Sequence, residues 1–195
     1  MTLEKREIID LIITILVLGL VFSLRDFSVT NILISLFVVG LAFLLHELAH
    51  REIARKFGAY ATYRIWPMGI VIALLFGILS GGRIIFAAPG AVYISALKIA
   101  RWKTESMRLS SEEHGLISAS GPLANLGLSL IFLFLNVLYP SGVFAMGIMI
   151  NIFLAFFNLL PVPPFDGYKV MRWDRKTWLA LFLTSLVGWV GTWFL

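Results

Sequence analysis

Two histidines four residues apart flank a glutamate within an otherwise apolar stretch: His46, Glu47 and His50. On a helix such residues share one face, so both imidazoles can reach one metal ion while the glutamate addresses a water on it. Zinc lowers the pKa of that water and polarises a peptide carbonyl, and Glu47 could move the proton to the leaving amine. Ionisable residues in an apolar helix are costly and usually functional, which favours a metal site over a chance match.

A catalytic zinc usually has three protein ligands, so one is still missing. Asp166 is the better candidate, because the proline-rich stretch NLLPVPPFDG (158–167) must end a helix and continue as extended backbone. His46 and Asn158 both lie roughly 22 Å into their apolar segments at 1.5 Å per residue, so this stretch begins at the depth of the histidines. A helix stop with a solvated aspartate is the alternative. His114, in a polar stretch, is interpreted as an exposed loop histidine.

A further polar group lies in the stretch SGPLAN (120–125). Gly121 allows close helix packing, which alone explains a small residue there. Asn125 is expected to face the inside of a helix bundle. It either orients a substrate or ligand or joins helices, and both interpretations stay open.

The elements that position these residues are expected to lie in a membrane. Of 195 residues, 59% are hydrophobic and 14% charged, which is far more apolar than a soluble domain. There is no cysteine, so thiolate metal sites are excluded. Membrane spans need about 20 mostly apolar residues. The expected spans are 8–24, 31–50, 116–138, 143–160 and 177–195.

The stretch 65–99 is apolar but interrupted by glycine and proline, with β-branched runs such as Ile70–Ile72. This pattern predicts turns and short strands rather than a helix. If 65–80 does not cross and the N-terminus is cytoplasmic, every lysine and arginine except Arg25 is cytoplasmic, as the positive-inside tendency favours. We therefore expect a polytopic α-helical membrane protein with about five to six transmembrane helices. A membrane-dipping β-hairpin or small sheet is expected to follow the histidine-bearing helix.

Taken together, HELAH, SGPLAN and NLLPVPPFDG resemble the site-2 protease family of intramembrane zinc metalloproteases, in order over about residues 31–167. The resemblance implies one zinc ion held by His46, His50 and Asp166, with Glu47 as the catalytic glutamate. Asn125 and Asn158 would be supporting polar residues. Residues 1–195 would be a single membrane domain with core 31–167, without a PDZ-like or CBS-like module.

The resemblance also implies a function. The enzyme would hydrolyse peptide bonds in or near transmembrane segments of single-span membrane proteins, releasing a regulatory domain. Its surroundings would be membrane lipid, with multi-pass topology, a cytoplasmic N-terminus and active-site side, and a prokaryotic cell membrane; no nucleic-acid partner is expected. A catalytically silent chaperone or scaffold of the same fold is the alternative, and the intact Glu47 argues against it. A metal transporter would need a polar path to the outer face, which the apolar ranges 31–45 and 143–157 do not provide.

A substrate helix must unwind before cleavage, and its freed backbone groups then need partners in a nearly dry site. An exposed strand edge supplies such partners, and the strand-like segments lie on either side of the turn at Pro89-Gly90. The alternative is that this hairpin only plugs the cavity. The candidate edge-strand residues are Ile84, Ile85, Phe86, Ala87, Val92, Tyr93 and Ile94.

Overall fold

The computed structural model describes residues 4–95, 97–100, 103–106 and 109–194. These residues are mostly helical, with two separate two-stranded sheets. The elements in chain order are α1 (Lys5–Ser23), η1 (Leu24–Asp26), α2 (Val29–Lys56), β1 (Tyr60–Ile65), α3 (Pro67–Ser80), β2 (Gly90–Ser95), β3 (Leu97–Ala100), β4 (Lys103–Ser106), α4 (Ser111–Leu138), α5 (Gly142–Asn158), α6 (Asp166–Trp173), α7 (Arg175–Gly191) and η2 (Thr192–Phe194).

Side-chain caps fix where the long helices begin. Ser28, Ser110 and Ser141 each accept a hydrogen bond from a backbone N–H in the first turn of α2, α4 and α5. Asp174 does the same for α7. Because the first N–H groups of a helix lack partners within it, these caps set the helix starts within the apolar ranges.

Helices occupy all five ranges expected to cross a membrane, with ends that differ by a few residues. Four helical stretches are long and apolar enough to span: Lys5–Asp26, Val29–Lys56, Ser111–Leu138 and Arg175–Phe194. α5 has 17 residues, or about 26 Å at 1.5 Å per residue. It is shorter than a hydrocarbon core of about 30 Å, so the number of spans stays a prediction.

The prediction of turns and strands between residues 65 and 80 was wrong, because 67–80 forms the helix α3, Ile70–Ile72 included. Pro67 stands in the first turn, where its missing N–H is not needed. Gly81 follows the last turn with φ of 60°, a left-handed conformation that favours glycine.

The glycines inside α3 serve packing rather than turning. Gly69, Ala73 and Gly77 recur every four residues and are buried. A Cβ added at Gly77 would lie 2.9 Å from the side chain of Val21 in α1. Gly77 therefore lets α3 approach α1 closely, whereas Gly69 lies against the backbone carbonyl of Ala88. Both glycines were interpreted as turn residues in the sequence, although they lie inside a helix.

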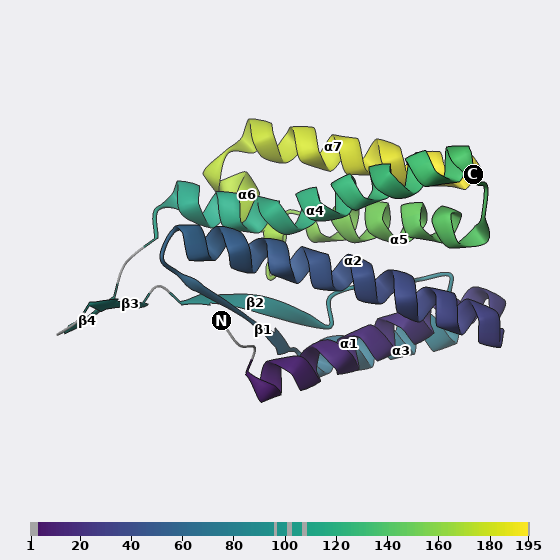
Figure 1. Cartoon of the computed structure of the whole chain (residues 1–195), viewed down its shortest axis with the longest axis horizontal. Helices are drawn as coiled ribbons and strands as arrows, with labels where there is room; N and C mark the ends of the chain where they lie inside the picture. The colour runs from purple at the N-terminus through teal and green to yellow at the C-terminus, as the bar shows by residue number, and fades with distance from the viewer. Residues whose placement is uncertain (1–3, 96, 101–102, 107–108, 195) are drawn as a thin grey trace.

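A small sheet follows the histidine-bearing helix, as predicted. β1 and β2 pair antiparallel, with Tyr63 opposite Val92. Val92–Ile94 lie within β2, but Ile84, Ile85, Phe86 and Ala87 form no strand, so the prediction of an edge strand at 84–87 was wrong. A second hairpin, β3 with β4, was not anticipated and projects from one end of the molecule (Figure 1).

The histidine-bearing helix α2 lies at the centre of the molecule (Figure 1). It packs against α4 and α5 on one side and against α1 and β1 on the other. α7 covers the outside of α5, and α3 runs along α1. The short helix α6 packs against the first turns of α4 and α7, near one end of α2 (Figure 1). This arrangement brings the proline-rich stretch before α6 to the end of α2 that carries the histidines.

Candidate metal centre

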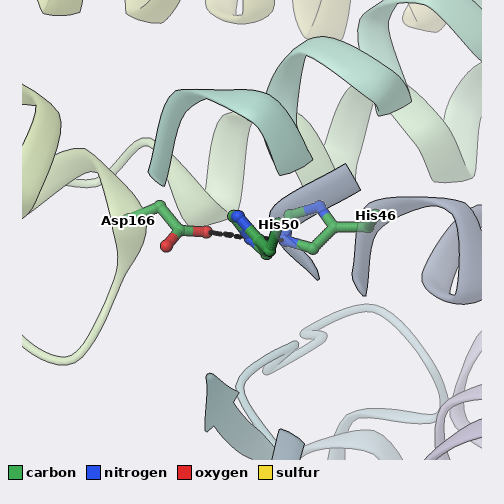
Figure 2. A group of neighbouring side chains, drawn as sticks. All are labelled: His46, His50 and Asp166. Carbon is green, nitrogen blue, oxygen red and sulfur yellow. Dashed lines mark hydrogen bonds and ion pairs between the residues drawn. The ribbon is translucent and has the colours of Figure 1, made fainter. Parts of the chain in front are cut away.

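The two histidines project from adjacent turns of α2 toward the same point (Figure 2). Both side chains are buried, and their Nε2 atoms lie 3.0 Å apart. α2 is one continuous helix from Val29 to Lys56, so no turn is needed to aim the imidazoles. The four-residue spacing alone therefore brings two of the three candidate ligands together, as the sequence predicted.

Asp166 completes the cluster from the far side (Figure 2). Its Oδ2 lies 3.4 Å from Nε2 of His46 and 3.0 Å from Nε2 of His50. α5 ends at Asn158 and α6 begins at Asp166, so the proline-rich stretch leaves the helix where expected and returns at the ligand. Gly167 lies so close to the backbone of Leu159 that any Cβ there would collide with it, which holds this return in place.

The spacing of these donor atoms fits zinc. Zinc bonds of about 2.0–2.2 Å in tetrahedral geometry place neighbouring ligand atoms roughly 3.3 Å apart. The three distances are 3.0, 3.0 and 3.4 Å. Burial opposes ionisation of the Asp166 carboxyl, but the two imidazoles and Lys169 outweigh it and hold its pKa well below the usual range. A lowered pKa favours the ionised form of the carboxyl, which is the form a metal ligand requires.

Asn125 holds His46 in the orientation that a metal ligand needs. The Nδ1–H of His46 donates to Oδ1 of Asn125 over 2.6 Å, which leaves Nε2 free. Asn125 is fully buried and donates in turn to the carbonyl of Ala42 and to Oδ1 of Asn151, at 3.1 and 3.0 Å. These contacts orient a histidine and also join α4 to α2 and α5, so both roles predicted for Asn125 stay open. Asn151 was missed, although it is a single amide within the apolar stretch 143–157.

His50 is oriented by the same helix through its backbone. Its Nδ1–H donates to the carbonyl of Ile117 over 2.7 Å, which again leaves Nε2 facing the cluster. Ser120 donates to the same carbonyl. Every residue has a backbone carbonyl, so the sequence could not indicate that Ile117 makes this contact.

Gly121 lies directly over the two metal-facing nitrogens. A Cβ added there would overlap Nε2 of His50 and lie 2.6 Å from Nε2 of His46. Close helix packing was the simple explanation for this glycine. The structure adds that any side chain would fill the space beside the ligand nitrogens.

A cavity of about 30 Å³ adjoins the cluster. That volume suits about one water molecule. Glu47 of α2 and Gly90–Val92 of β2 both lie in its wall. Asn158 and Lys169 also line it, so the predicted supporting asparagine reaches the site. Lys169, whose Nζ lies 3.6 Å from Oδ1 of Asp166, was not predicted from the sequence.

His114 lies outside this cluster. It belongs to the first turns of α4 and is half-buried, so its assignment to an exposed loop was wrong. Among the described residues, the grouping of ligand-type side chains close enough to hold a metal ion consists of His46, His50 and Asp166.

The chain is similar to known proteins along nearly its whole length. It is 41% identical over 194 residues to "Putative zinc metalloprotease MJ0611" of Methanocaldococcus jannaschii, covering 96% of this chain and 94% of the relative. The chain belongs to this zinc metalloprotease family. It is also 30% identical over 142 residues to "Putative zinc metalloprotease YwhC" of Bacillus subtilis, covering 66% of this chain and 63% of that protein. No protein-family model matches the chain, and no solved structure matches it.

Family and geometry agree on the cofactor. The zinc metalloprotease relatives and the buried trio of two histidines and one aspartate both support zinc. The long apolar helices indicate a membrane protein. The individual roles of Glu47, Asn125 and Asn158 stay predictions that the geometry makes specific.

Proposed function

We propose that this protein is an intramembrane zinc endopeptidase of the site-2 protease type, with single-span membrane proteins as substrates. The observation that carries the proposal is that a two-histidine, one-aspartate cluster, with Glu47 beside it, lies among helices long and apolar enough to cross a membrane. Bound zinc would supply a nucleophilic water and polarise the scissile carbonyl. Residues of the chain would move the protons, orient the ligands and bind the substrate.

Glu47 is the residue proposed to move protons. Its carboxylate lines the small cavity beside the ligand atoms and comes from the same helix as both histidines. It would accept a proton from the attacking water and later donate it to the leaving amine nitrogen. His46 and His50 keep their Nε2 atoms turned to the metal because their Nδ1–H groups are bound elsewhere.

The substrate strand would bind along β2, because the outer edge of β1 is already covered. The N–H of Tyr63 donates to Glu7 over 3.1 Å, and the N–H of Ile65 donates to Asp10 over 3.4 Å. Both carboxylates come from α1. In an antiparallel pair, residues alternate between facing the partner strand and facing away. Val92, opposite Tyr63, therefore points its backbone groups away from β1, toward the open edge.

The open edge of β2 lies beside Glu47 and the ligand cluster. Gly90–Val92 line the cavity that contains Glu47 and the ligand cluster. Among the described residues, the N–H of Val92 has no hydrogen-bond partner outside the sheet. An unwound substrate paired here would have its backbone groups satisfied and its peptide bond beside Glu47. A cytoplasmic N-terminus and active-site side, a prokaryotic cell membrane and the release of a regulatory domain complete the proposal.

Replacing Val92 with proline should lower cleavage about tenfold or more while zinc stays bound. Proline removes the N–H that faces the substrate but is tolerated on an edge whose donors point outward. Losing one buried backbone hydrogen bond costs about 1–3 kcal/mol, and 1.4 kcal/mol corresponds to tenfold. The measurement is the cleavage rate of a single-span reporter by purified protein of matched zinc content.

Two variants separate the lost donor from other effects. Val92→Ala shortens the same side chain but keeps its N–H, so it should cut faster than the proline variant. Ile94→Pro removes the next outward-facing donor, at a residue that does not line the cavity. Equal rates for Val92→Ala and Val92→Pro would show that the substrate is not held by this edge.

The function itself is tested by zinc removal and return. Protein purified in detergent should cleave a single-span reporter, stop after treatment with a chelator, and resume when one equivalent of zinc is added. The physical reason is that Glu47 alone cannot make water attack an amide at a useful rate. Cleavage that continues without metal would contradict the proposed function.

A further inference from the structure

A second cavity lies on the other side of Glu47, between α1, α2 and the sheet. Its volume is about 100 Å³. Glu47 and Val92 line both this cavity and the smaller one at the ligand cluster, so the two cavities adjoin at these two residues. The larger cavity therefore begins where a peptide bond would be cut.

The walls of this second cavity are mainly apolar. They include Leu11 of α1, Leu44 and Leu48 of α2, and Ala61 and Tyr63 of β1. None of these five residues belongs to the ligand cluster, so the cavity is not part of the metal site itself.

Two charged residues that line this cavity, Arg51 and Glu7, are paired with each other. Arg51 donates to both carboxylate oxygens of Glu7, at 2.8 and 2.6 Å, and Glu7 is buried. The same carboxylate accepts the N–H of Tyr63. Because the charges of Arg51 and Glu7 are paired with each other, they give an incoming ligand no unpaired charge. The chemistry of the cavity therefore selects an apolar occupant.

The size of the cavity limits which apolar side chain can fit. An apolar cavity of about 150 Å³ holds benzene, with six carbon atoms. By that scale about 100 Å³ holds roughly four carbons. The branched side chain of leucine or isoleucine has this size, whereas alanine underfills the space and phenylalanine or tryptophan exceeds it.

Strand geometry says how such a side chain would arrive. Side chains of successive strand residues point to opposite faces of a sheet. Tyr63 and Val92 are cross-strand neighbours and both line the cavity, so this face of the sheet is turned toward it. In a substrate strand added beside β2, every second side chain would point to the same face.

We propose that this cavity is the specificity subsite of the enzyme and takes a leucine-sized aliphatic side chain of the substrate next to the cleaved bond. The inference rests on the proposed endopeptidase function. It assigns Leu11 and Ala61 as specificity-determining residues, although neither takes part in the proposed chemistry.

The test uses single-span reporters with alanine-rich apolar segments, in which alanine, leucine or phenylalanine stands on either side of the bond that the wild type cuts. The wild type should cut the best leucine reporter about tenfold or more faster than its alanine counterpart, since small apolar differences in a fitted pocket change rates by this amount. Ala61→Leu fills the cavity and should abolish that preference. Leu11→Ala enlarges it and should raise cleavage of the phenylalanine reporter relative to leucine.

The matched control is Thr62→Leu. Thr62 is the next residue of β1 and lines a hollow on the opposite face of the sheet, with Arg6 and Arg64. A leucine at position 62 adds similar bulk to the same strand without entering the cavity. The preference for leucine reporters should therefore persist in this variant. A preference that survives Ala61→Leu and Leu11→Ala, in protein that retains zinc, would overturn the proposal. So would equal loss in Thr62→Leu and Ala61→Leu.

A binding measurement separates this inference from the proposed function. Glu47→Gln protein, which should hold substrate without cutting it, is tested for binding of the same reporters with and without Ala61→Leu. Tighter binding of leucine reporters that Ala61→Leu removes would support the subsite even if no form of the protein cleaved them. Cleavage by the wild type with neither a rate nor a binding preference would leave the endopeptidase standing and reject the subsite.

Discussion

Replacing Gly121 with alanine should empty the metal site. The added methyl would overlap Nε2 of His50 and approach Nε2 of His46 to 2.6 Å, in the space beside the ligand atoms. Relief would require α4 to move away from α2, which would also strain the hydrogen bond between His46 and Asn125. We expect most of the zinc to be lost on purification, measured as zinc per chain by elemental analysis, with cleavage reduced in proportion.

Gly127→Ala is the control for this change. Gly127 lies six residues further along α4, and a Cβ added there meets no atom within 4 Å. Alanine in the interior of a helix is favourable relative to glycine, so this variant should keep its zinc and its activity. If Gly121→Ala binds zinc as well as Gly127→Ala does, the zinc does not lie beside Gly121. The proposed position of the zinc between the three ligand atoms would then be wrong.

Replacing Glu47 with glutamine should reduce cleavage by roughly 10²–10⁴-fold, the usual contribution of general acid–base catalysis. The amide keeps the shape of the side chain but cannot accept a proton from water. Since Glu47 is not one of the three ligand residues, zinc content should stay at one per chain. The measurement pairs a single-span reporter assay with elemental analysis of the same sample.

Glu52→Gln tests whether removing any carboxylate from α2 has this effect. Glu52 is exposed and pairs with Arg55 on the surface of the same helix. Exposed pairs contribute little to stability, so this variant should cut at the parental rate. A Glu47→Gln protein that cuts as fast as Glu52→Gln would remove Glu47 from the chemistry.

The ligand cluster could be predicted because its causes are local in the sequence. The spacing of His46 and His50 determines one helix face, and the prolines before Asp166 end a helix at a depth that can be counted. Each inference needed only the geometry of one element.

The contacts that orient the ligands depend on neighbours far along the chain. Asn151 acts on His46 through Asn125, and the carbonyl of Ile117 fixes His50. A buried asparagine can be noticed in a sequence, but its partner cannot be identified without the packing of α4 on α5. A backbone carbonyl carries no sequence signal at all.

The glycines of α3 were misinterpreted because glycine has two unrelated uses. Gly81 ends the helix with positive φ, as a turn residue does. Gly69 and Gly77 instead allow close packing inside it. Their four-residue spacing could have indicated a helix face, but the β-branched residues between them favoured a strand. Contact with α1 overrode that preference.

Intramembrane cleavage by this protein is tested by locating the bond that is cut. A single-span reporter in lipid vesicles is incubated with purified zinc-loaded protein, and the masses of the products are measured. We expect the wild type to yield two fragments whose masses place the cut within or at the edge of the apolar segment, and Glu47→Gln protein to leave the reporter whole. Cuts found only in the water-exposed parts of the reporter, or fragments of equal yield with Glu47→Gln protein, would contradict it.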